Sequence, residues 1–305
     1  MNELLNLTRK NNAPNENMYA HTMSNADKTA LIPQSAKIRT EYSAPDVSED
    51  STDSVVTSPR NTGNADFFPA KKFSLSRATT QMEKALNPGT ILGEQLRMLR
   101  TRLSLLQKQK GVRTILMTST FPQEGKSFTS CALAGVIAQE HEKRVLIIDA
   151  DLRKHGSGRD FGLTNGNISI GTTQVLQGTN EFQKSLLKST DPEFWFLPSG
   201  KLPLNPSELL GSPKMEEILH FAAEKFDWVI VDGPPALALP DPCLIAPLCD
   251  AVVLIVRVKS TSAKLVKATI DKIGRERICG IVLNRQKQIH SSKYYYQYYN
   301  QNNKK

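Results

Sequence analysis

Short apolar segments alternate with stretches of helical length over the last two thirds of this chain. The apolar segments have the length of strands and span 114–117, 145–148, 194–197, 228–231, 252–258 and 278–283. The stretches between them include 127–139, 213–226 and 262–273. This alternation predicts βαβ units, in which helices cover both faces of a mostly parallel sheet. We therefore expect an α/β fold.

A further helix is predicted ahead of the first strand. Leucines at 92, 96, 99, 103 and 106 follow a 4-3-4-3 spacing. This spacing places them on one side of an amphipathic helix. The helix is expected to pack its apolar side against the rest of the fold.

The composition changes near Pro88. Residues 1–88 carry ten acidic and ten basic residues, so the net charge of +9 belongs to residues 89–305. Leu, Ile, Val and Phe fill 14 of the first 88 positions, which is under the share of about 20% below which chains tend to be disordered. We expect residues 1–87 to be a disordered polar extension, 88–287 a folded domain and 288–305 a flexible tail.

Several classes of protein are excluded by simple counts. The four cysteines form no CxxC pair and have no partnering His spacing, so we expect buried thiols and no zinc site. The longest apolar run is far shorter than the roughly 20 residues of a membrane span, and the N-terminus lacks the apolar core of a signal peptide. A cytoplasmic protein is expected.

A phosphate-binding loop is predicted where the first strand meets the next helix. Residues 118–127 read TSTFPQEGKS. In such a loop the backbone N–H groups and the helix N-terminus face the phosphates, Lys126 reaches their oxygens, and Ser127 offers a hydroxyl to Mg²⁺. Thr120 replaces the glycine that the strict pattern has six residues before the lysine.

Aspartates follow two of the buried strands. Asp149 and Asp151 end the strand 145–148, in the pattern Asp-x-Asp-x-Arg, and Asp232 ends the strand 228–231. Carboxylates at the ends of parallel strands point toward the crevice in which open α/β sheets bind ligands. An aspartate after a buried strand is also the form of a magnesium-supporting residue in nucleotide hydrolases. The bland interpretation is a solvated loop with one aspartate capping a helix.

Together these motifs resemble the bacterial tyrosine kinases of capsule and exopolysaccharide loci. The resemblance extends from Glu94 to Tyr299. It includes a Glu-x-x-Arg-x-x-Arg helix at Glu94, Arg97 and Arg100, the segment NPSELL at 205–210, and a tyrosine cluster near the C-terminus. The resemblance implies the fold of a phosphate-loop NTPase of the partitioning-ATPase type, related to MinD and ParA proteins.

The resemblance implies an ATP- and Mg²⁺-dependent protein-tyrosine autokinase that regulates exopolysaccharide or capsule synthesis, polymerisation and export. The resemblance implies that catalysis depends on Lys126, Asp149, Asp151 and Asp232, and that Mg²⁺ is bound by Ser127, Asp149, Asp151 and Asp232. It implies that the nucleotide is bound by Gln123, Glu124, Gly125, Lys126, Ser127, Phe128, Asn284 and Arg285. It further implies autophosphorylation in trans at Tyr294, Tyr295, Tyr296, Tyr298 and Tyr299, and subunit contact through Glu94, Arg97 and Arg100. Asp149 is the expected base, with Asp151 as the alternative. Gln123 stands where many relatives have glycine.

The resemblance also implies partners. The chain resembles the split form of the family, in which a separate membrane polysaccharide co-polymerase activates the kinase and recruits it to the inner face of the plasma membrane. A cognate tyrosine phosphatase would reset the cycle, and the kinase would form a homo-oligomeric ring. No nucleic-acid partner is expected.

Other interpretations stay open from the sequence. The chain could be a partitioning or positioning ATPase that phosphorylates nothing, although such proteins usually carry a second lysine where this loop has Thr120, Phe121 and Pro122. It could be a nucleotide-binding scaffold without catalysis. The basic tyrosine-rich tail could be a stacking surface for single-stranded nucleic acid. In isolation, Arg97 and Arg100 could simply be a solvated helix face.

Overall fold

The structure is a computed structural model that describes residues 68, 70–75, 78–154, 157–163 and 168–285. These residues belong to one compact unit. Its strands are β1 (Lys71–Phe73), β2 (Thr114–Ser119), β3 (Val145–Asp149), β4 (Leu187–Ser189), β5 (Trp195–Leu197), β6 (Trp228–Asp232), β7 (Ala251–Arg257) and β8 (Ile278–Asn284). Its α-helices are α2 (Thr80–Leu86), α3 (Ile91–Lys110), α4 (Lys126–Ala138), α5 (Ser157–Asp160), α6 (Thr172–Leu176), α7 (Pro206–Leu210), α8 (Pro213–Lys225), α9 (Asp241–Ile245) and α10 (Ala263–Ile273). Short 3₁₀ turns are η4 (Gln183–Ser185), η5 (Ala246–Leu248) and η6 (Arg275–Arg277).

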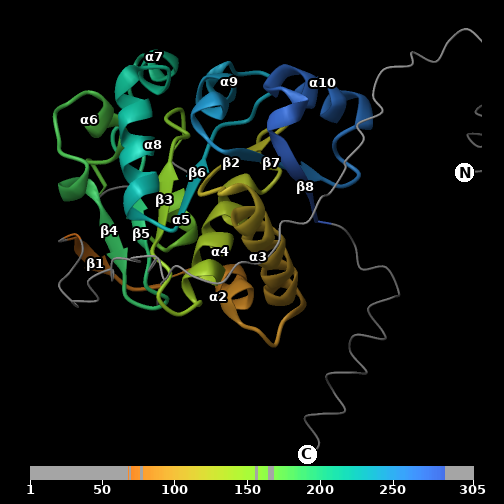
Figure 1. Ribbon diagram of the computed structural model, residues 1–305, viewed down its shortest axis with the longest axis horizontal. Coiled ribbons are helices and arrows are strands. Elements are labelled where there is room, and N and C mark those ends of the chain that lie inside the picture. Colours follow the sequence, from red (N-terminus) through yellow and green to blue (C-terminus); the bar gives the residue numbers. More distant parts are fainter. Residues whose placement is uncertain (1–67, 69, 76–77, 155–156, 164–167, 286–305) are drawn as a thin grey trace, which may run out of the picture. The chain divides into compact units, whose positions relative to one another are not determined.

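The strands form one sheet in the order β1-β4-β5-β3-β6-β2-β7-β8 (Figure 1). Neighbouring strands are parallel except for β4 and β5. The predicted mostly parallel sheet is therefore confirmed. In the register of β3 and β6, Asp149 lies opposite Asp232, so the two strand-end carboxyl groups share one edge of the sheet.

Alternate residues of the central strands enter two separate cores. On one face Leu146, Val229 and Val231 pack with α8 and α9. On the other face Ile147 and Ile230 pack with α2, α3 and α4. Burial on both faces explains why these strands are apolar at every position. The two helical layers fix the strand ends at which the site lies.

The folded unit begins earlier in the chain than the composition predicted. The boundary at residue 88 is too late, because β1 pairs with β4 and α2 packs beside α3 and α4 (Figure 1). Met82 and Ala85 of α2 are fully buried, and Thr79 caps the helix by accepting a hydrogen bond from the Met82 backbone N–H. A few buried side chains suffice to anchor so short a helix, and they barely change the average composition. The rest of the predicted extension lies outside the described residues.

The two arginines of the predicted contact helix bind within their own chain. Arg97 Nη2 donates to the Leu86 carbonyl at 3.1 Å and to Gln139 Oε1 at 2.7 Å. Arg100 Nη1 donates to the Val136 carbonyl at 3.0 Å, and its Nε lies 2.9 Å from Glu140 Oε1. These contacts place positive charge at the C-terminal ends of α2 and α4, where the helix dipole favours it. Subunit contact through this helix stays a prediction.

In the part of the chain that the structure describes, no helix is long and apolar enough to cross a bilayer. All four cysteines are free, but only Cys131 and Cys249 are buried, whereas Cys243 is half-buried and Cys279 is exposed. The prediction of buried thiols is thus right for two of the four.

Candidate active site

The predicted phosphate loop joins β2 directly to α4 and is anchored by a buried glutamate. Glu124, which is 2% exposed, accepts hydrogen bonds from the backbone N–H groups of Phe121 at 2.8 Å and Arg257 at 3.2 Å, and from the Thr261 hydroxyl. The carboxylate therefore ties the loop to the end of β7. Only the backbone of Glu124 is left to take the predicted part in nucleotide binding.

Two loop residues have left-handed backbone. Gly125 has φ 93° and Gln123 has φ 65°. Glycine adopts such angles without strain, whereas a residue with a Cβ adopts them rarely. Gln123 thus keeps the backbone of a glycine-type loop. Asn284, at the end of β8, closes over the loop and donates from Nδ2 to the Glu124 carbonyl at 2.8 Å.

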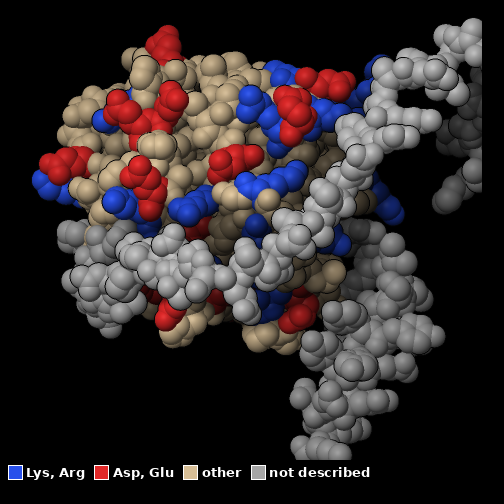
Figure 2. Space-filling view, viewed as in Figure 1, with Lys and Arg blue, Asp and Glu red and all other residues tan. Residues whose placement is uncertain are grey.

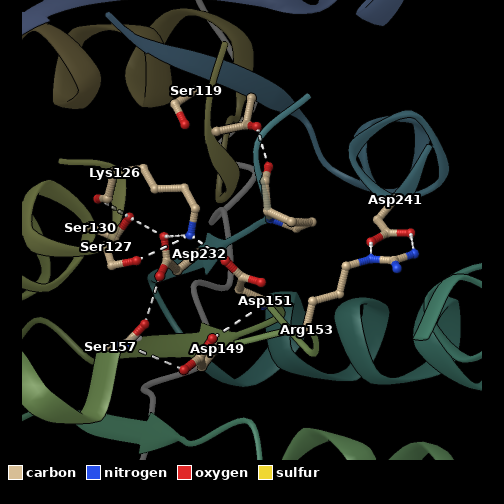
Figure 3. Close-up of polar contacts among 12 residues, drawn as sticks. Ser119, Lys126, Ser127, Ser130, Asp149, Asp151, Arg153, Ser157, Asp232 and Asp241 are labelled. Atoms are coloured by element: carbon tan, nitrogen blue, oxygen red, sulfur yellow. Dashed lines mark hydrogen bonds and ion pairs between the residues drawn. The ribbon is translucent and has the colours of Figure 1, made fainter. Parts of the chain in front are cut away.

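Lys126 lies at the N-terminus of α4 among acidic side chains (Figure 3). Its Nζ is 2.9 Å from Asp151 Oδ2, 3.5 Å from Asp232 Oδ1 and 3.1 Å from Ser127 Oγ. Burial by itself lowers the pKa of Lys126, but the charges of Asp232 and Asp151 outweigh burial, and the pKa is raised. The lysine is therefore a fixed positive charge.

Asp149 and Asp232 lie deeper than Asp151. Asp149 is 1% exposed and accepts hydrogen bonds from the backbone N–H groups of Asp151 at 3.1 Å and Ser157 at 3.4 Å. Burial raises the pKa of Asp149 to about 8, and the charge of Asp232 adds to the rise. Asp232 accepts from the hydroxyls of Ser130 at 3.1 Å and Ser157 at 2.7 Å. The site holds more negative charge than Lys126 balances.

A cavity of about 610 Å³ opens over this cluster. Its lining includes the loop and α4 residues Pro122, Gln123, Gly125, Lys126, Ser127 and Phe128, together with Asp151, Arg153, Lys154, Arg159, Asp160, Pro235, Leu239, Arg285 and Thr79. Basic side chains are therefore frequent around it, and Figure 2 shows Lys and Arg grouped across the middle of the face drawn there. Burial and the charge of Asp232 raise the pKa of Asp160 to about 6. A basic cavity at a helix N-terminus suits a polyphosphate.

Most of the predicted ligand residues meet at this cavity, but at different depths. Glu124, Asp149, Asp232 and Asn284 do not line the cavity and lie behind residues that do. The predicted phosphorylation sites Tyr294, Tyr295, Tyr296, Tyr298 and Tyr299 lie outside the described residues. Arg285, the last described residue before them, lines the cavity.

The three aspartates do not form a ready-made metal cage. Among the described residues, no group of three or more His, Cys, Asp or Glu side chains is placed to hold a metal ion. Asp151 is instead engaged with Lys126, and Asp232 with two serine hydroxyls and Lys126. Mg²⁺ usually binds through one or two carboxylates plus phosphate oxygens and water, and this donor set fits that habit.

Two serines of the site were missed in the sequence. Ser130 and Ser157 both donate to Asp232, and Ser130 also donates to the Lys126 carbonyl at 2.9 Å. Ser130 could have been found, since it lies four residues after Lys126 on the same side of a helix. Ser157 carried no such signal, because it begins α5, a helix of only four residues with no recognisable pattern in the sequence.

Comparison with known sequences extends the picture. Residues 113–277 match the family model described as AAA domain. The chain is 32% identical over 223 residues to the tyrosine-protein kinase YwqD of Bacillus subtilis, covering 72% of this chain and 92% of that protein. It is 32% identical over 200 residues to the tyrosine-protein kinase wzc of Salmonella typhimurium, covering 65% of this chain. It spans only 27% of the length of that second relative.

Comparison with solved structures agrees. The kinase domain of the Escherichia coli tyrosine kinase ETK is 33% identical with a TM-score of 0.62, covering 67% of this chain and 80% of that one. The chimerical protein CapA2B2 is 27% identical with a TM-score of 0.63, covering 72% of this chain and 96% of that one.

Proposed function

This chain belongs to the family of bacterial tyrosine-protein kinases, and on that premise we propose that it is an ATP-dependent autokinase that phosphorylates its own C-terminal tyrosine cluster. One observation carries the proposal. Lys126, at the N-terminus of α4, lines a basic cavity together with Asp151 and Arg285. The chain continues from Arg285 toward Tyr294. Phosphate-binding groups, a carboxylate and the residue from which the chain runs on toward the tyrosines thus line one cavity.

The loop residues support a role in binding ATP phosphates. Backbone N–H groups of residues 123–128 precede or begin α4, where the helix dipole attracts anions. Lys126 would exchange Asp151 and Asp232 for phosphate oxygens when the nucleotide binds, which releases both carboxylates for other partners. Arg285 would lie beside the nucleotide in the cavity lining, and Asn284 would support the loop from behind through the Glu124 carbonyl.

The carboxylates left by Lys126 support Mg²⁺ as the cofactor. Ser127, Asp151 and Asp232 are the side chains that would hold the ion, with Asp149 behind them. When bound, the ion would neutralise charge that develops on the phosphate oxygens. The excess negative charge of the cluster and the raised pKa of Asp149 fit a second cation besides Lys126.

Two aspartates are candidates for accepting the proton of the tyrosine hydroxyl, whose ordinary pKa is near 10. Asp149 is favoured by its burial, which raises its pKa and so strengthens its carboxylate as a proton acceptor. Asp151 is favoured by its place in the cavity lining. Asp149→Asn and Asp151→Asn, each compared for ADP binding and for phosphotyrosine formation, separate the two. The base is the residue whose loss stops transfer while ADP still binds.

The wider roles are part of the same proposal. The kinase acts in trans within a homo-oligomeric ring, is activated at the inner membrane face by a polysaccharide co-polymerase, is reset by a phosphatase, and regulates capsule or exopolysaccharide synthesis. Family membership supports these roles. Contact through Glu94 of α3 is compatible with the inward-turned arginines, because the α3 surface also exposes Met98 and Leu105.

The test is phosphotyrosine formation by the purified chain with ATP and Mg²⁺. Lys126→Met should lower the signal by several orders of magnitude, since phosphoryl transfer depends on charge stabilisation. Lys214→Met on α8, which removes only a surface ion pair with Glu217, is the matched control and should match wild type. Equal signal from wild type and Lys126→Met would overturn the assignment. ATP hydrolysis without phosphotyrosine would favour the partitioning-type ATPase.

A further inference from the structure

The arginine of the Asp-x-Asp-x-Arg motif is held away from Lys126 by a buried acid. Arg153 Nε lies 2.6 Å from Asp241 Oδ2, and its Nη2 lies 3.0 Å from Asp241 Oδ1 (Figure 3). Asp241 begins α9 and is fully buried. Ser207 of α7 completes the group, since its hydroxyl donates to Asp241 Oδ1 at 2.5 Å and accepts from Arg153 Nη2 at 2.8 Å. Arg153 of the Asp-x-Asp-x-Arg motif and Ser207 of the NPSELL segment thus bind the same carboxylate, that of Asp241.

A second cation holds the segment that leads to this carboxylate. Lys272 of α10 donates from Nζ to the carbonyls of Ala236 at 2.8 Å, Leu237 at 3.0 Å and Leu239 at 3.0 Å. An ammonium group has three N–H donors, so all of them have an acceptor here. Residues 233–241, which we term the clamped segment, are therefore fixed by Lys272 in the middle and by Arg153 at the end.

The clamped segment connects both carboxylates that pair with Lys126. It starts directly after Asp232, and its far end binds Arg153, which lies two residues after Asp151. Pro235 and Leu239 of the segment line the same cavity as Lys126. The start of the clamped segment is also fixed to the end of β2, because the Thr118 hydroxyl donates to the Pro234 carbonyl at 2.6 Å. Movement of this segment would shift Asp151 and Asp232 together.

We propose that Arg153, Asp241 and Lys272 are positioning residues for phosphoryl transfer, which hold the clamped segment so that Asp151 and Asp232 keep their places beside Lys126. The inference rests on the proposed kinase function. Arg153, whose Nε and Nη2 both bind Asp241, is assigned a role through Asp241 and not as a ligand of the phosphates. Small displacements of positioning groups are expensive in phosphoryl transfer, where alignment and charge placement supply most of the rate.

The opposite assignment makes a different prediction. If Arg153 bound the phosphates directly, Asp241 would compete for it, and Asp241→Asn would leave affinity and rate unchanged or improved. If Arg153 and Asp241 act as one unit, removing either partner has the same effect, and removing both adds nothing. A double-mutant cycle therefore decides between the two assignments.

The experiment uses the full 305-residue chain and measures kcat, KM for MgATP, ADP affinity and Tm. The cycle consists of wild type, Arg153→Ala, Asp241→Asn and the double variant. Asp227→Asn is the matched control, because Asp227 pairs with Arg144 at the opposite ends of the same strands, β3 and β6. For Lys272→Met the control is Lys267→Met, which lies on the exposed side of the same helix.

We expect Arg153→Ala and Asp241→Asn each to lower kcat by about tenfold or more. The double variant should lower kcat by the same factor as either single variant. Lys272→Met should lower kcat by a comparable factor. Both controls should keep kcat and KM within about twofold, even where Tm falls. Lys272→Arg should recover part of the lost kcat, since it restores N–H donors to the carbonyls. Rate losses that add in the double variant, or an unchanged kcat in Asp241→Asn or Lys272→Met, would overturn the inference.

The two failures can be told apart. If wild type binds ADP but makes no phosphotyrosine, even with the cytoplasmic tail of the proposed co-polymerase added, the kinase assignment fails, and the same cycle is then scored on MgADP affinity. Coupled weakening in Arg153→Ala and Asp241→Asn supports the positioning role, and additive or absent weakening overturns it. If wild type makes phosphotyrosine, the kinase assignment stands whatever the cycle shows.

Discussion

The side-chain amide of Asn284 occupies the space that a side chain on Gly125 would need. Its Nδ2 donates to the carbonyl of Glu124, the residue before this glycine, and a Cβ on residue 125 would collide with Nδ2. The last residue of the last strand therefore closes the phosphate loop of the first half of the fold. The contact joins residues 160 positions apart.

Gly125→Ala should abolish nucleotide binding, because the new Cβ meets Asn284 and because φ is 93° at this position. Asn284→Ala alone should weaken ADP binding moderately, by loss of one hydrogen bond of about 1 kcal/mol. The double variant should recover part of the binding lost in Gly125→Ala, since the collision is gone while the backbone strain stays. Isothermal titration with ADP measures all three, and no recovery at all would mean that φ alone sets the requirement for glycine.

Gln123 adopts a left-handed backbone, with φ 65°, without being glycine. Gln123→Gly removes this strain but adds freedom to the unfolded chain, so its free energy of unfolding should equal that of wild type or exceed it by up to about 1 kcal/mol. Gln123→Val should lose about 1–2 kcal/mol, because a β-branched residue tolerates this region worst. Urea unfolding checks the order, and a Val variant as stable as the Gly variant would contradict it.

Met82 tests where the folded unit begins. Its side chain is fully buried between α2 and the core, so Met82→Ala should lower the free energy of unfolding by about 2–5 kcal/mol. Met98→Ala is the control, because Met98 is 52% exposed, and it should change stability by less than about 1 kcal/mol. Equal effects of the two substitutions in urea unfolding would return the boundary to residue 88.

Asp160 should make the stability of the ligand-free protein depend on pH. Its folded pKa of about 6 lies above the ordinary value of 3.8, so the protonated form favours folding. The stabilisation is present below about pH 4 and is lost as the pH rises through about 6. Relative to wild type, Asp160→Asn should therefore gain about 1–3 kcal/mol between pH 4 and pH 7. Thermal unfolding across this range measures the gain, and a difference that does not change with pH would refute it.

Phosphorylation in trans can be tested by mixing two variants, neither of which can phosphorylate its own tyrosine cluster. Lys126→Met keeps the tyrosines, and a variant with Tyr294, Tyr295, Tyr296, Tyr298 and Tyr299 changed to Phe keeps the proposed site. Tyr294 lies nine residues beyond Arg285, which lines the cavity, so the connecting chain can extend up to about 30 Å from that cavity. We expect phosphotyrosine on the Lys126→Met chain in the mixture, measured by mass spectrometry. Its absence there, with an active wild type, would indicate transfer in cis.

The central strands were predictable because both of their faces are buried. β3 and β6 are apolar at four successive positions and end in an aspartate, so strand, burial and site could be inferred together. β4 offers no such pattern, since it is three residues long and contains Lys188, which is buried and pairs with Glu193. Such a short strand, which lies between β1 and β5, follows from its neighbours and not from its own residues.

The residues of the site likewise fall into those that could be predicted from the sequence and those that could not. Lys126 and Asp232 were predictable from local context, because a loop and a strand end each mark themselves in the sequence. The partner of Arg153 was not, since Asp241 lies 88 residues away in an unrelated loop and helix start. The inward direction of Arg97 and Arg100 likewise depends on where α2 and α4 end in space. Pairings between distant segments are set by the assembled fold.

The strand order determines when this site can form during synthesis. β2 lies between β6 and β7, which leave the ribosome more than a hundred residues after it. Until residue 232 has emerged, the apolar strand that carries the phosphate loop has no neighbour on either side. Its second neighbour is complete only at residue 257, and Asn284 is added later still. Nascent chains therefore expose an unpaired apolar strand while more than a hundred further residues are added, which is the condition under which chaperones are recruited. The phosphate loop of this kinase therefore gains its full set of neighbours only after residue 284 has been made.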